Sequence, residues 1–277
     1  DKAFAGAGCR LIPSAVMANA VGFNLARAVG PAIGGVTVAA LGAASAFVVN
    51  AFSYLGMLAT LSWWRPKRAR SDLPPEPMGT ALAAGLRYVL LSPHIVAILT
   101  RCMLYTIPIA TVPALMPMVA RDLLGGGAPT YGLLLGGFGV GAMTGALSSA
   151  PLRERFSSDT LLQRLSLVAC VAVVGIGQSR WAPLTMLATV LAGASWTLAF
   201  ANFNIAIQLS SPRWVTARML ATYQTVVFAS IALGSWLWGE FASDAGLRVA
   251  LTVAGLTSLV SLATARWLPV AVQQLGA

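Results

Sequence analysis

Charged residues are scarce in this chain: lysine, arginine, aspartate and glutamate make up 9% of its 277 residues. A water-soluble protein of ordinary composition carries about a quarter. The 37 residues between Arg27 and Arg65 contain none, and further uncharged runs cover 102–120, 123–152, 181–212, 219–239 and 249–265. Because so little charge cannot cover a water-exposed surface of this size, the composition excludes an ordinary soluble domain.

Residues that carry chemistry are also few. There is one histidine, His94, and there are eight acidic residues and three cysteines. The cysteines Cys9, Cys102 and Cys170 lack the spacing of a metal or redox motif. A membrane enzyme would need paired acids, a nucleophile beside a base, or a metal site, and a channel would need rings of charge or repeated pore filters. We therefore expect no enzyme activity, no metal site, no cofactor and no channel.

Long continuous apolar runs are what the chain does have, with a mean hydropathy of +0.78. A bilayer core of about 30 Å needs about 20 residues per helical crossing, and only closed barrels or helices satisfy their backbone within it. The runs are continuous rather than alternating, which excludes a transmembrane barrel. We expect an all-α polytopic membrane bundle with eight crossings, near 18–39, 43–63, 94–117, 129–150, 161–178, 181–205, 217–239 and 247–267.

The net charge of +10 is distributed by loop. Basic residues gather in alternate connections: Lys2, Arg10, Arg65, Lys67, Arg68, Arg70, Arg87, Arg153, Arg155, Arg164, Arg213, Arg218 and Arg266. The other connections hold only Arg121, Arg180 and Arg248. Lysine and arginine accumulate in cytoplasmic loops, so the excess predicts topology rather than nucleic-acid binding. Both ends of the chain are expected in the cytoplasm.

The organisation of the chain follows from one polar stretch. Residues 65–80 combine a basic cluster with four prolines, which is typical of an exposed linker. An amphipathic segment over 81–92 follows, with Arg87 and Tyr88 expected as interface anchors. The linker region 65–92 therefore divides residues 1–64 from 93–277. At an offset of 199 residues Pro13 matches Pro212, Asn19 matches Arg218 and Gly35 matches Gly234, a weak parallel repeat of the kind that relates the halves of many transporters.

Four segments carry a resemblance to a known family. They are FNLARAVGPAIGG at 23–35, GLRYVLLSPHI at 85–95, MVARDLLGGGAPTYGLLLGGFGVGAMTGAL at 118–147 and SSPRWVTARMLATYQTVVFASIALGSWLWG at 210–239. The first resembles the glycine-proline motif in the fifth helix of major facilitator antiporters. The others resemble the transmembrane secretion effectors of that superfamily, which include enterobactin-exporter-like and macrolide-efflux-like proteins.

The resemblance implies that the eight crossings are helices five to twelve of a twelve-helix major facilitator fold, so that the first four helices lie upstream of Asp1. It implies export of a small molecule, such as a drug, a macrolide or a siderophore, across the bacterial inner membrane. It further implies alternating access, a proton as counter-ion and a monomeric complete protein. The alternative is a transporter-like protein without transport that serves as a structural or accessory membrane subunit.

Two arginines are expected within crossings, Arg27 and Arg101. An intramembrane charge is expensive and usually faces a cavity or a partner, although a long side chain can also reach the interface. Neither arginine is expected to have a carboxylate at its depth within this chain, so each is predicted to face an anionic substrate or a partner in the helices upstream of Asp1. Asn24, Tyr105, Tyr223 and Gln224 are further candidates for the substrate pathway.

The resemblance assigns Gly22, Gly30, Pro31, Gly34 and Gly35 to the antiporter motif; glycines that merely pack helices are the alternative. Proline at 31 would kink its helix. Gly137, Gly141 and Gly145 fit simple helix packing, and Asn202 and Asn204 a structural role. Pro108, Pro113 and Pro117 are predicted to bend the crossing near 94–117.

Overall fold

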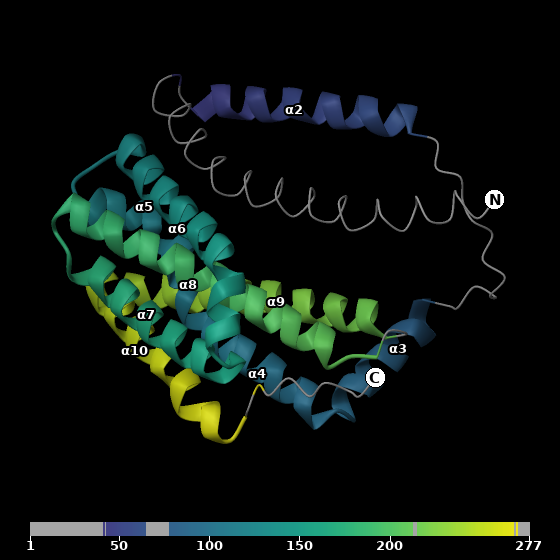
Figure 1. Cartoon of the computed structure of the whole chain (residues 1–277). Helices are drawn as coiled ribbons and strands as arrows, with labels where there is room; N and C mark the ends of the chain where they lie inside the picture. The colour runs from purple at the N-terminus through teal and green to yellow at the C-terminus, as the bar shows by residue number, and fades with distance from the viewer. Residues whose placement is uncertain (1–40, 42, 65–77, 213–214, 269, 271–277) are drawn as a thin grey trace.

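The computed structural model of the chain describes residues 41, 43–64, 78–212, 215–268 and 270. Within these ranges every regular element is helical and no strand occurs, as the all-α expectation requires. Figure 1 shows helices α4 to α10 gathered in one bundle, with α2 (Ala43–Trp63) lying apart from them. The expected crossing at 18–39 lies outside the described residues.

Among the described residues, five helical spans are long and apolar enough to cross a membrane. The first is the composite span Pro93–Leu123, formed by α4 (Pro93–Ile109), α5 (Thr111–Met118) and the π-helical turn η1 (Val119–Leu123). The others are α6 (Ala128–Arg155), α7 (Ser158–Gln178), α8 (Ala182–Leu209) and α9 (Thr216–Ala245).

Two shorter apolar helices lie at the positions of two further expected crossings. They are Phe47–Trp63 within α2, and α10 (Leu247–Ala263), which ends in the 3-10 turn η2 (Thr264–Arg266). Seven of the eight expected crossings thus correspond to apolar helices in the described part of the chain. The amphipathic segment after the linker is also helical, as α3 (Met78–Leu90), and it packs against the start of α9.

Glycines set the closest helix contacts in the bundle. Gly141 on α6 lies so close to α8 that a methyl group there would overlap the carbonyl of Val190, and Gly193 on α8 lies equally close to the Phe138 carbonyl of α6. Gly145 is similarly close to Ala194, with 2.6 Å between an added Cβ and the Ala194 oxygen. Small residues let two membrane helices approach closely. The packing role expected for these α6 glycines is confirmed.

Proline interrupts the first long span, as its sequence predicts. Pro108 lies inside α4, which ends at Ile109, and α5 begins only at Thr111. Proline removes one backbone donor and clashes with the preceding turn, and the Thr111 hydroxyl donates to the Pro108 carbonyl at 2.6 Å. Pro117 precedes the π-helical turn, an element common where a helix is perturbed.

Candidate functional site

Arg101 is the fully buried charge of the described bundle. Its side chain has no exposed surface, and its Nη1 donates to Oδ1 of Asp159 in an ion pair between α4 and α7. The expectation that no carboxylate of this chain could meet Arg101 is therefore wrong. In a helix the side chain leans toward the N-terminus, so the long arginine reaches back from the middle of α4 to the first turn of α7.

The same ion pair also holds backbone groups from the end of the chain. Arg101 Nη1 donates a second hydrogen bond to the Leu268 carbonyl at 3.3 Å. The Val270 amide donates to Asp159 Oδ1 at 3.0 Å. Asp159 retains 27% side-chain exposure, whereas Arg101 has none. The Nη1 group of the guanidinium is thus paired with a partly exposed carboxylate and a backbone carbonyl, while the arginine itself has no exposed surface.

Three polar residues meet along one turn of α8. Tyr223 on α9 donates its hydroxyl to the Phe200 carbonyl at 3.0 Å. Asn202 donates its side-chain amide to the Ser158 carbonyl at 3.0 Å, which agrees with the structural role expected for it. Tyr105 on α4 packs edge-on against Phe203, with ring centroids 6.2 Å apart. The helices α4, α7 and α9 are therefore all fastened to the same turn of α8.

The remaining candidates fall in three places. Gln224 is exposed on α9, while its neighbour Tyr223 is buried. Tyr105 is buried, and its hydroxyl has no hydrogen-bond partner among the described residues. The other candidates all lie outside the described residues: Asn24, Arg27, Gly22, Gly30, Pro31, Gly34 and Gly35.

Helix α9 contacts the break between α4 and α5 through a hydrogen bond and a close backbone approach. The indole nitrogen of Trp238 donates to the Ile107 carbonyl at 2.9 Å, next to Pro108. One turn earlier on α9, Gly234 brings the backbone so close that an added Cβ would stand 2.6 Å from the same Ile107 oxygen. The sequence pattern did not single out Trp238 or Asp159, because each acts on a residue far away in the chain.

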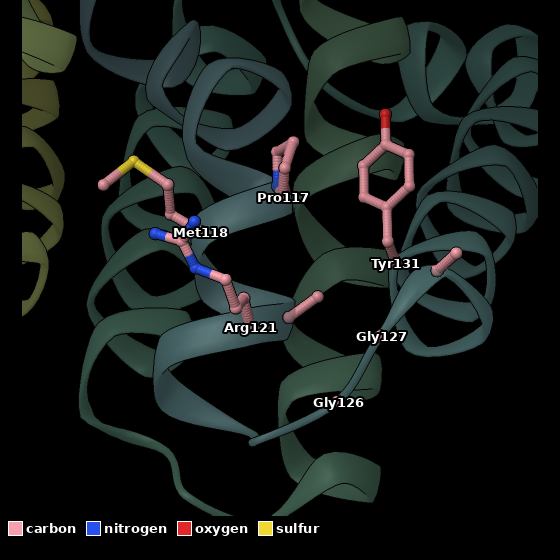
Figure 2. Close-up of a pocket in the computed structure, with 8 residues that line it drawn as sticks. Pro117, Met118, Arg121, Gly126, Gly127 and Tyr131 are labelled. Carbon is pink, nitrogen blue, oxygen red and sulfur yellow. The ribbon is translucent and has the colours of Figure 1, made fainter. Parts of the chain in front are cut away.

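Two of the cavities among the described residues lie at opposite ends of the long spans. One has a volume of about 340 Å³ and lies between the end of α5, η1 and the start of α6; Figure 2 shows Met118 and Arg121 on one side of it and Tyr131 on the other. Arg121 there is paired with its neighbour Asp122, Nε to Oδ1 at 2.5 Å. The other cavity, of about 460 Å³, is lined by Arg153, Phe156, Asp159, Leu209 and Val270 among others.

The described residues contain no cluster of three histidine, cysteine or acidic side chains placed to hold a metal ion. Their buried polar and aromatic side chains instead join helices to one another. These contacts are one ion pair, several side-chain hydrogen bonds to backbone carbonyls, and edge-on aromatic contacts such as Trp196 with Phe200, with ring centroids 4.7 Å apart. Broken helices and buried polar fasteners in an apolar bundle are typical of membrane transport proteins.

Comparison with known proteins agrees with that class. The transmembrane secretion effector family matches residues 8–275. The chain belongs to this family of major facilitator transporters.

Two curated relatives cover most of the chain. The multidrug efflux pump Tap of Mycolicibacterium fortuitum is 26% identical over 261 residues, which are 89% of this chain and 61% of the relative. The uncharacterized MFS-type transporter YfiS of Bacillus subtilis (strain 168) is 26% identical over 266 residues, 91% of this chain and 63% of the relative. The chain thus spans about three fifths of the length of these relatives.

Proposed function

We propose that this chain works as part of a secondary active exporter, which moves a small molecule across the bacterial inner membrane by alternating access. The observation that carries the proposal is the broken span α4–α5, whose break is held by Trp238 from α9. Alternating access needs one group of helices to rock or bend against another. Two comparisons support export as the direction of transport. The chain belongs to the transmembrane secretion effectors, and one of its relatives is named a multidrug efflux pump.

The candidate pathway residues divide by burial. Gln224 is exposed on α9 and is proposed to face the substrate, together with Asn24 and Arg27. Tyr105, Tyr223 and Arg101 are buried among helices, and we assign them to holding the pathway walls in place. The glycine-proline motif from Gly30 to Gly35 is proposed to seal the pathway against leak.

Proton antiport is the proposed source of energy. Both chain ends are proposed to lie in the cytoplasm, which the distribution of basic residues among the loops supports. A drug, a macrolide and a siderophore are the substrate classes to test. The alternative function is a structural or accessory membrane subunit without transport, which the same fasteners would also serve.

Efflux from cells separates these two functions. Cells that express the full-length gene product are loaded with ethidium, a labelled macrolide or a ferric siderophore, and loss of the compound is followed with and without a protonophore. We expect protonophore-sensitive export of at least one compound, and slower export from a Gln224→Ala variant at equal protein level. Identical loss from expressing and empty cells for all three classes would support the structural alternative.

A further inference from the structure

The described residues that follow α10 remain packed against the bundle. We call η2 together with Leu268 and Val270 the C-terminal strap. Val270 is 1% exposed, and Ala265 within η2 is 7% exposed, so the strap is packed rather than free.

Two hydrogen bonds fix the backbone of the C-terminal strap, and both use the same ion pair. The Leu268 carbonyl accepts from Arg101 on α4, at 3.3 Å, and the Val270 amide donates to Asp159 on α7, at 3.0 Å. Hydrogen bonds to ionised groups are stronger than neutral ones. The Leu268 carbonyl oxygen thus accepts from the cationic Arg101, and the Val270 N–H donates to the anionic Asp159, so that both bonds are charge-assisted.

The burial of Arg101 makes the ion pair and the C-terminal strap depend on each other. Nε and Nη2 of Arg101 are buried without a hydrogen-bond partner among the described residues. Its charge thus depends on Asp159 and on the Leu268 carbonyl. Removing one member of a buried ion pair leaves the other uncompensated, so the C-terminal strap and the ion pair support each other.

We propose that the C-terminal strap is a conformational fastener, which the Arg101–Asp159 pair holds closed across α4, α7 and α10. Closed, it ties the end of α10 to the part of α4 that precedes the break at 110. It also supplies Val270 to the lining of the 460 Å³ cavity, together with Phe156 and Leu209. Release of the strap frees that part of α4 to move relative to α10 and opens the cavity.

Hydrogen exchange of the full-length protein in detergent, read by mass spectrometry, tests the fastener directly. In Asp159→Ala the Val270 amide loses its acceptor, and exchange in residues 264–270 should rise by at least about tenfold, the factor that loss of one charge-assisted hydrogen bond gives. Asp159→Asn keeps an acceptor oxygen and should show a smaller rise. Glu154→Gln removes an exposed acid five residues away and should leave exchange unchanged.

A second variant works in the opposite direction. Removal of residues 268–277 leaves Arg101 and Asp159 intact, and exchange should rise in the first half of α4 and in the first turn of α7. Unchanged exchange there, or unchanged exchange of 264–270 in a folded Asp159→Ala protein, would overturn the proposal. Neither readout measures transport, so a failure of the fastener is distinct from a failure of the proposed export.

Discussion

Trp238 donates its indole N–H to the carbonyl oxygen of Ile107, 2.9 Å away on a helix 131 positions earlier in the chain. The contact lies beside Pro108, at the point where α4 gives way to α5. A carbonyl next to a helix break needs a partner when water is excluded. The tryptophan therefore stabilises one geometry of the break.

Trp238→Phe tests that bond. The variant keeps a smaller aromatic ring but lacks the donor. We expect a loss of more than about 1 kcal/mol in stability, because the net value of one hydrogen bond is lost together with the packing of the larger ring. If the break bends during transport, export should also change in rate. Trp236→Phe is the matched control, since Trp236 is 63% exposed on the same helix. Equal thermal unfolding of the two variants would contradict the assignment.

Gly141→Ala should separate α6 from α8. A methyl group at 141 would overlap the Val190 backbone, which cannot yield as a flexible side chain would, and overpacking costs about 1–3 kcal/mol. Thermal unfolding in detergent measures the loss. Gly239→Ala is the control, because nothing lies within 4 Å of an added Cβ there. A neutral Gly141→Ala would show that the two helices are not in close contact.

Arg101→Met and Asp159→Leu should each destabilise the protein, by about 3–5 kcal/mol for loss of one partner of a buried pair. The double variant should lose less than the sum of the single losses, because no charge is then left unpaired. Chemical or thermal unfolding gives the three values. Additive losses would mean that the two side chains do not act as a pair.

Labelling tests the orientation. In a protein whose native cysteines are replaced, Asp72→Cys should react with an impermeant maleimide only after cells are opened. Gly127→Cys should react in intact cells, and this position avoids the positive φ of Gly125. Labelling of Asp72→Cys but not Gly127→Cys in intact cells would reverse the topology.

The helices were predictable because one property, apolar length, decides them in a membrane. The crossing at 43–63 was expected and α2 spans Ala43–Trp63, while the proline-rich crossing was expected to bend and is broken at 110. The partner of Arg101 was not predictable from depth along single helices. Asp159 belongs to the first turn of another helix, and only the reach of the arginine side chain and the tertiary packing bring the two together.

The glycine seam between α6 and α8 limits where this half of the molecule can change shape. At Gly141 and Gly193 the backbone of each helix lies directly against the backbone of the other. Translation or rotation of one helix would therefore bring backbone atoms of the two helices into collision. We therefore expect α6 and α8 to move as one rigid unit. Movement within the described bundle is therefore expected at the interruption between α4 and α5, where α9 makes its contact, and not between α6 and α8.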